Sequence, residues 1–214
     1  NISEKSKHQY QNAGTYDIKI KGKYESLQTT KTANYTKLKK VKQWGTTGLK
    51  YVYLRFCYNL NEIVSPTENS FIKLLGISFP DTRIQSIPEN LFANCPNVIY
   101  FNNTFEGCSI TSIPEKLFAN CHNAKKFQKT FENCENLTSI PENLFDNCKE
   151  VELFFKTFFY CEKITGNAPE LWTRGTNSEE NNYEGNPDGF NCFAGCEGLE
   201  NYDVIPHYWK NMAE

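Results

Sequence analysis

Apolar residues recur along this chain in a fixed order that repeats about every 26 residues. The phrase IPExLFxNC occurs at 87–95, 113–121 and 140–148, so its first isoleucine returns after 26 and then 27 residues. A second phrase, TFxxC, lies at 104–108, 130–134 and 157–161. A period in the twenties is typical of repeat proteins, in which each unit forms one coil that buries its apolar side against its neighbours. We therefore expect function to lie on a surface that stacked strands display.

The repeats match the leucine-rich pattern LxxLxLxxN/CxL. The matching coils begin near Leu49, Leu74, Val98, Ala124, Val151 and Phe193, the last being degraded. In three coils two extra residues put a phenylalanine at the second apolar strand position: Phe105, Phe131 and Phe158. The pattern predicts an α/β repeat, a right-handed leucine-rich repeat solenoid with short parallel strands and about six coils.

Alternation along a strand predicts which side chains face outward. Successive side chains of a strand point to opposite faces, so the neighbours of the inward phenylalanines are expected on the outer strand face. This reasoning places Ser78 there and gives a candidate binding surface made of Tyr53, Arg55, Thr104, Glu106, Thr130, Glu132, Thr157, Phe159 and Tyr160. A threonine ladder with acids beside it and aromatics at its end would suit a peptide or a sugar. The alternative is that Phe159 and Tyr160 pack under the neighbouring insertion.

The two ends of the chain differ from the repeats. Residues 10–26 alternate Tyr16, Ile18 and Ile20 with polar residues, which predicts a half-buried strand, and 27–37 are predicted as a polar connector. We therefore divide the chain into a β-rich N-terminal cap at 1–37 and a solenoid at 38–214. A segment rich in Asn, Gly and acids at 173–189 is predicted as an insertion on a coil edge.

The chain has nine cysteines, six of which recur at steps of 13 or 14 residues: Cys95, Cys108, Cys121, Cys134, Cys148 and Cys161. This regular spacing is unlike a disulfide framework and lacks the paired CxxC of a zinc site. It favours small buried side chains with free thiols, one in each turn of the coil. Cys192 and Cys196 are four residues apart, so a bridge or a metal between them stays an alternative to an unbonded pair.

Catalytic chemistry is not indicated by the remaining polar residues. His8, His122 and His207 lie in the N-terminal segment, a turn in the middle of the solenoid and the C-terminal cap, so the coil geometry is expected to keep them apart from a nucleophile. A glutamate follows proline in three coils, at 89, 115 and 142, which suits the start of a helical turn better than a pair of glycosidase carboxylates. Acids of the insertion, Glu179, Glu180, Glu184 and Asp188, lack the spacing of a calcium loop. We expect no catalytic residue, metal or cofactor.

The composition of the chain limits the classes of partner that it is expected to bind. The net charge is −2, so no nucleic-acid footprint is indicated, and no run of 18 apolar residues could span a membrane. The chain begins at Asn1 without an apolar leader, so either a signal segment has been removed or the sequence is a trimmed piece of a longer one.

The repeats resemble those of the BspA-like leucine-rich repeat surface proteins of gut Bacteroidetes. The resemblance is carried by FxxCxxLTSIPENLFxNC at 131–148, its copies, and QWG at 43–45, and it covers roughly 38–214. The segment at 10–20 is similar to the closing strands of a PKD-like β-sandwich. The resemblance implies a secreted or cell-surface protein, in some members lipid-anchored, that binds or adheres rather than catalyses.

Two functions follow from these observations. The first is a cell-surface binding or adhesion module, monomeric, that holds an extracellular protein or glycan on its strand face. The second is a structural spacer that carries a neighbouring domain and has no ligand of its own. An exposed aromatic cluster on the strand face would favour binding, and a uniformly polar face would favour the spacer.

Overall fold

The computed structural model describes residues 11–20, 23–29, 35–45, 48–67, 70–174 and 187–210. Strands and helices are short throughout this part of the chain. The strands are β1 (Ser26–Gln28), β2 (Lys40–Val41), β3 (Tyr51–Tyr53), β4 (Glu62–Ile63) and β5 (Gly76–Ser78). The helical elements are the 3₁₀ turns η1 (Tyr35–Lys37), η2 (Leu171–Thr173) and η3 (Tyr202–Val204), and the α-helix α1 (His207–Lys210).

The strands form two small parallel sheets, one with the order β1-β3-β5 and one with β2-β4. Parallel neighbours require a crossover between them, and here each crossover is one circuit of the chain. This arrangement agrees with the α/β class and the short parallel strands that the sequence predicts.

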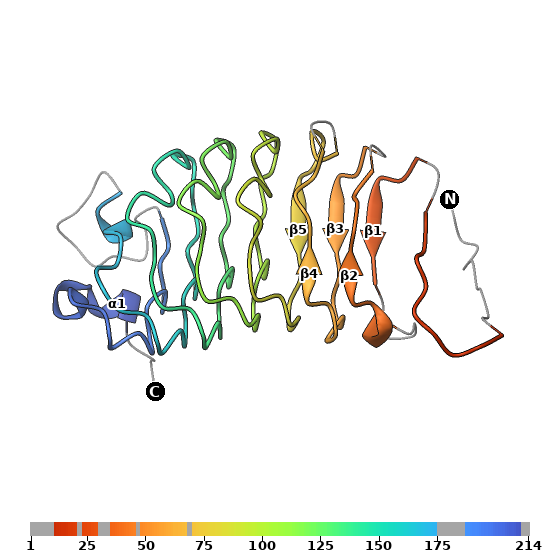
Figure 1. Cartoon of the computed structure of the whole chain (residues 1–214). Helices are drawn as coiled ribbons and strands as arrows, with labels where there is room; N and C mark the ends of the chain where they lie inside the picture. The colour runs from red at the N-terminus through yellow and green to blue at the C-terminus, as the bar shows by residue number, and fades with distance from the viewer. Residues whose placement is uncertain are drawn as a thin grey trace.

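The alignment of the first sheet continues beyond β5 through single parallel bridges. Gly76 pairs with Tyr100, and the series goes on through Lys126 and Leu153 to Asp188. Backbone bonds tie the successive circuits together, for example from Phe105 N to Thr130 O at 2.8 Å. Figure 1 shows these circuits, which we call coils, lying side by side from β1 to the C-terminal end.

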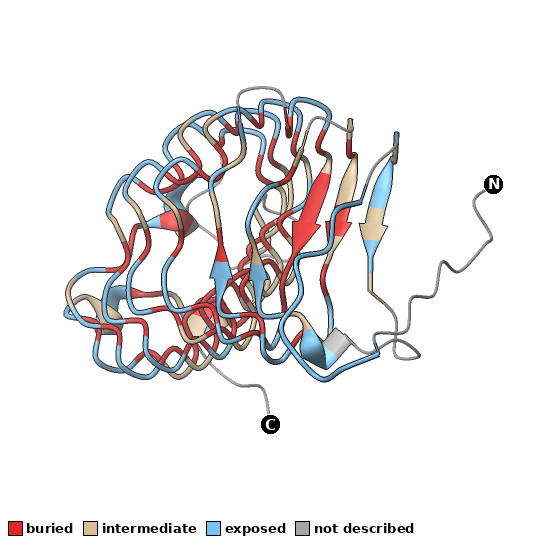
Figure 2. Cartoon of the chain, turned by 45° about the vertical axis from the view of Figure 1, so that its right-hand side comes forward, coloured by how far each residue is buried: buried red, intermediate tan, exposed pale blue. Residues whose placement is uncertain are grey.

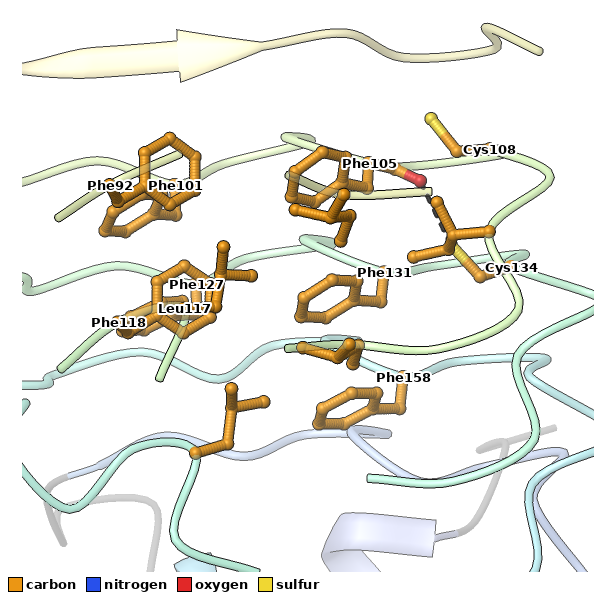
Figure 3. Close-up of a cluster of buried hydrophobic side chains, with 14 of the residues drawn as sticks. Phe92, Phe101, Phe105, Cys108, Leu117, Phe118, Phe127, Phe131, Cys134 and Phe158 are labelled. Carbon is orange, nitrogen blue, oxygen red and sulfur yellow. Dashed lines mark hydrogen bonds between the residues drawn. The ribbon is translucent and has the colours of Figure 1, made fainter. Parts of the chain in front are cut away.

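Phenylalanines fill the interior in three columns that run across the coils (Figure 3). In one column Phe131 stacks on Phe105 at 5.7 Å and on Phe158 at 5.3 Å between ring centroids. The other two columns are Phe101–Phe127–Phe154 and Phe92–Phe118–Phe145. Rings of different columns meet edge to face, as Phe118 and Phe127 do, or at a tilt, as Phe118 and Phe131 do. The predicted inward direction of Phe105, Phe131 and Phe158 is confirmed, since all three are fully buried.

Buried cysteines lie beside the phenylalanine columns and hydrogen-bond to the backbone of neighbouring coils. The thiol of Cys134 donates to the carbonyl O of Phe105 at 3.1 Å, and that of Cys161 donates to Phe131 O at 3.0 Å. Each bond joins a coil to the preceding one, in the way expected of a small side chain with a weak S–H donor. All nine cysteines are free and buried, including Cys192 and Cys196.

The C-terminal end of the columns is closed by Trp209 of α1. Its indole stacks on the Phe193 ring, with 6.4 Å between ring centroids, and its centroid lies 6.3 Å from that of Phe154. A Cβ on Gly189 would stand 2.2 Å from the indole, so this position has to be glycine for Trp209 to fold in. Gly189 takes the place that Phe101, Phe127 and Phe154 hold in earlier coils.

The half-buried strand predicted within residues 10–26 is wrong over residues 11–20. Residues 11–20 form no strand, and Tyr16, Ile18 and Ile20 are 43, 72 and 60% exposed. An alternating segment becomes a strand only where its backbone hydrogen-bonds to a neighbouring strand, and residues 11–20 do not pair with the outer edge of β1, the terminal strand of its sheet. Burial rises from β1 through β3 to β5 (Figure 2).

The predicted connector at 27–37 is also wrong, because it contains the end of β1 and all of η1. The aligned series therefore begins one coil earlier than the boundary at residue 37 implies. Residues 1–10, most of the predicted insertion (175–186), and with it Glu179, Glu180 and Glu184, lie outside the described residues.

Candidate functional site

The outward side chains of the aligned segments form two rows, which together we call the strand face. The register of β3, β5 and the bridges gives the first row as Tyr51, Gly76, Tyr100, Lys126, Leu153 and Asp188. The second row lies two residues further along each segment and contains Tyr53, Ser78, Asn102, Gln128, Phe155 and Phe190. The residues between the rows point inward and are buried, as Val52 and Ile77 are in β3 and β5.

The predicted threonine ladder is not on this face, and that part of the predicted surface is wrong. Thr104, Thr130 and Thr157 are fully buried, and Ser78, although it stands in the second row, is covered by its neighbours. The Thr130 hydroxyl lies 2.7 Å from Phe127 O and 2.9 Å from Phe101 O, so it can donate within its own coil or to the preceding one. The threonines therefore tie coils together.

The error comes from a bend that alternation does not reveal. Asn103, Lys129 and Lys156 have φ of 57, 56 and 53°, in the left-handed region that non-glycine residues seldom occupy. This bend interrupts the period of two, so two consecutive side chains, such as Thr130 and Phe131, both turn inward.

The acids and aromatics that follow the bend were predicted to face a ligand. Their side chains instead make contacts that stabilise the bend. Asn103 Nδ2 donates to Glu106 Oε2 at 2.5 Å, and Lys129 pairs with the buried Glu132 at 2.8 Å. Burial, with the charge of Glu132 as a further cause, raises the pKa of Glu106.

In the next coil the corresponding contact is aromatic. The ammonium of Lys156 lies 4.3 Å from the ring centroid of the buried Phe159. Tyr160 is half-buried, meets Phe159 edge to face at 4.5 Å, and lies against Gly195 of the following coil. These two aromatics therefore help to pack one coil on the next, and Phe159 is not available as a binding residue.

Three tyrosines, half-buried in β3 and exposed at Tyr100, gather on the strand face. The rings of Tyr51 and Tyr53 stack at 5.8 Å, and Tyr100 is 37% exposed. Arg55 lies over the Tyr53 ring at 5.7 Å, and Lys126 lies over the Tyr100 ring at 6.0 Å. We call these five residues the tyrosine platform.

Gly76 of β5 makes this cluster possible. A Cβ at Gly76 would stand 2.9 Å from the Tyr53 hydroxyl and 3.5 Å from a Tyr51 ring carbon. The absent side chain lets Tyr53 lean over β5 toward the coil of Tyr100. Burial raises the pKa of Tyr53, so its hydroxyl stays protonated at neutral pH and can both donate and accept.

A second aromatic group lies at the other end of the face. Phe155 stacks on Phe190 at 5.9 Å, and Tyr208 of α1 contacts Phe190 at 5.1 Å. Asp188 accepts from the Tyr208 hydroxyl at 3.0 Å and from Phe190 N at 2.9 Å. These contacts anchor the C-terminal end on the last coils, so we assign the group a structural role.

A shallow groove of about 730 Å³ runs beside the tyrosine platform. Leu75, Ile99, Lys50 and Lys125, among others, line it, each directly preceding a first-row residue. The two lysines are paired with Glu25 and Glu152 at 2.8 and 2.7 Å. A smaller hollow of about 300 Å³ adjoins it at the exposed His122.

Reactive groups are kept inert in the described part of the chain. Burial raises the pKa of the Cys108 and Cys148 thiols to about 12, so they stay protonated at neutral pH and are poor nucleophiles. Within the same residues, no three His, Cys, Asp or Glu side chains are grouped as metal ligands. His122 Nδ1 donates to Asn147 O at 3.3 Å on an exposed turn.

Of the nine predicted residues, Tyr53 and Arg55 lie on the tyrosine platform, and Tyr51, Tyr100 and Lys126 were missed. A usable signal was present, because Tyr51, Tyr100 and Lys126 each stand two residues after the first apolar residue of their coil. Aligning the coils on that residue, before the two-residue insertion, would have put them in one row.

No protein-family model matches the chain, and no curated protein is significantly similar to it in sequence. Among the described residues no helix has both the length and the apolar character needed to cross a bilayer. Function is therefore inferred from the residues and their geometry.

Proposed function

We propose that this chain is a leucine-rich repeat solenoid of the BspA-like kind and acts as a non-enzymatic binding module. Its place would be the cell surface or the extracellular space, as the resemblance implies. The parallel segments recur every 24 to 27 residues from Tyr51 to Leu153 and carry inward phenylalanines and cysteines, which supports the solenoid assignment. The ligand-binding surface is the strand face, centred on the tyrosine platform.

The observation that carries this proposal is the grouping of Tyr51, Tyr53 and Tyr100 on an open face with a cation beside two of the rings. Tyr and Arg are enriched at interfaces, because a large rigid ring or a planar guanidinium gives contact area at small entropic cost. A spacer has no need to keep three tyrosines and two cations together on its surface. The platform therefore favours binding over the spacer.

The test is a screen of glycans and extracellular proteins against the parent chain and a Tyr53→Ala, Tyr100→Ala variant. Truncating central interface tyrosines costs about 2 kcal/mol or more, which is over tenfold in affinity. A Tyr58→Ala variant is the matched control, because Tyr58 is 43% exposed and lies outside the two rows. Unchanged urea midpoints would show that both variants fold.

The proposal holds if the parent binds a ligand, the platform variant loses it and the control keeps it. If every ligand of the parent binds the platform variant equally well, the strand face is not the binding surface. If the folded parent binds nothing in the screen, the spacer function is favoured.

A further inference from the structure

The chemistry of the tyrosine platform also indicates what it binds. We propose that its ligand is an acidic polysaccharide, a polymer of sugar rings that carry carboxylates. This deepens the proposed function and rests on it. The argument uses the charge, the shape and the spacing of the platform.

The charge on the platform is positive, and Glu152, the acid whose pKa is lowered mainly by its bond to Lys125 and also by the charge of Lys126, is already paired with Lys125. In the described part of the chain, neither Arg55 nor Lys126 forms an ion pair, whereas the nearby Lys50 is paired with Glu25. The remaining members of both rows between these cations are uncharged: Gly76, Ser78, Asn102 and Gln128. An anionic ligand would therefore meet two free cations, and a guanidinium binds a carboxylate through two parallel hydrogen bonds.

The shape favours sugar rings over a peptide. Peptides are usually anchored by side chains that enter pockets, and the groove and the hollow described above lie beside the platform rather than on it. The platform instead presents the exposed ring of Tyr100 and the half-buried rings of Tyr51 and Tyr53. Because an aromatic face is electron-rich, it attracts the polarised C–H bonds on the flat face of a sugar ring.

The spacing suits a linear polymer. Tyr53 and Tyr100 lie on coils separated by β5 and in different rows, so they are about 10 Å apart across the coils and about 7 Å apart along them. A short stretch of a sugar chain lying diagonally across the coils covers this distance, so two of its rings could stack on the two tyrosines. The carboxylates of those rings would reach Arg55 and Lys126, which stand beside these same two rings.

The experiment is a binding titration of the parent chain with polygalacturonate, alginate and hyaluronan, each compared with its methyl-esterified form. Esterification keeps the rings and removes the charge. We expect at least one acid polymer to bind, its ester to bind more than tenfold more weakly, and added NaCl to weaken the acid form, since exposed charges are screened by salt. Poly-L-glutamate, an acidic peptide without sugar rings, should bind more than tenfold more weakly.

Variants separate stacking from charge. Tyr53→Ala should weaken binding of the acid polymer at least tenfold, and Tyr53→Phe should restore most of it. An Arg55→Gln, Lys126→Gln variant should bind acid and ester alike. A Lys116→Gln, Lys149→Gln variant is the matched control, since both lysines are exposed and outside the strand face, and it should bind as the parent does.

Three results would overturn the assignment. If the ester binds as tightly as the acid polymer, the ligand is a neutral glycan. If poly-L-glutamate binds as tightly as the acid polymer, the ligand is an acidic peptide. If no uronate polymer binds while another ligand still depends on Tyr53 and Tyr100, the acidic polysaccharide is wrong and the binding module stands. If no ligand of the parent chain depends on Tyr53 and Tyr100 for its binding, the proposed function itself is refuted.

Discussion

Replacement of Phe131 by alanine tests the interior arrangement on which the strand face depends. Phe131 is fully buried at the middle of its column, with ring centroids at 5.7 Å to Phe105, 5.3 Å to Phe158 and 6.3 Å to Phe118. Truncation of a buried phenylalanine costs about 3–5 kcal/mol, and more where the site cannot collapse.

The site has little freedom to collapse. Backbone bonds hold the flanking coils at fixed spacing, at 2.8 Å from Phe105 N to Thr130 O and 2.9 Å from Phe131 N to Thr157 O. We therefore expect a loss in the upper half of that range, about 4–5 kcal/mol. Phe131→Leu keeps most of the volume and should cost less than about 1.5 kcal/mol.

The assay is equilibrium urea unfolding followed by circular dichroism and tryptophan fluorescence. Coincident transitions would show that one free energy describes the whole chain, which repeat proteins do not guarantee. The matched control is Ile72→Ala, which removes an apolar side chain that is 47% exposed and should change stability by under about 0.5 kcal/mol. A loss below about 1 kcal/mol for Phe131→Ala would show that the inward and outward sides of the coil are wrongly assigned.

Three further changes test other parts of the structure, each by urea unfolding. Thr130→Val should cost about 1–2 kcal/mol because it removes a buried donor, whereas Thr130→Ser should cost clearly less; equal losses would refute the hydroxyl's role. Gly189→Ala should cost about 1–3 kcal/mol, with a changed fluorescence of Trp209, whose indole the new methyl would overlap; a neutral effect would contradict that packing. Glu106 has a raised pKa in the folded chain, so its stabilising contribution is greatest at low pH and falls as pH rises from about 4.3 through the raised value. Glu106→Gln should therefore gain stability relative to the parent across that interval, and a constant difference would refute the burial of this carboxyl.

The interior could be predicted because its signal is periodic. A phenylalanine or a cysteine returns at the same offset in every coil, and only one direction lets Phe105, Phe131 and Phe158 pack on each other. The hydrogen bonds of the cysteines follow from the same spacing, as for Cys134 with Phe105 O.

The site was only partly predictable because local geometry decides it. Left-handed φ is expected of glycine or asparagine, and nothing in the sequence marks Lys129 or Lys156 as bend residues. Without those bends, alternation places the threonines outside. The prediction of an N-terminal strand was wrong for a different reason. The alternation of Tyr16, Ile18 and Ile20 does not tell whether a neighbouring strand is there to pair with them.

The central claim is that ligand is held on the tyrosine platform, and hydroxyl-radical footprinting tests it most directly. The folded chain would be oxidised with and without a saturating ligand from the screen, and side-chain oxidation measured by mass spectrometry. We expect ligand to protect Tyr51, Tyr53 and Tyr100 and to leave Tyr202 of η3 unchanged. Protection confined to residues outside the strand face, with these three tyrosines oxidised as fast as in the free chain, would contradict the account.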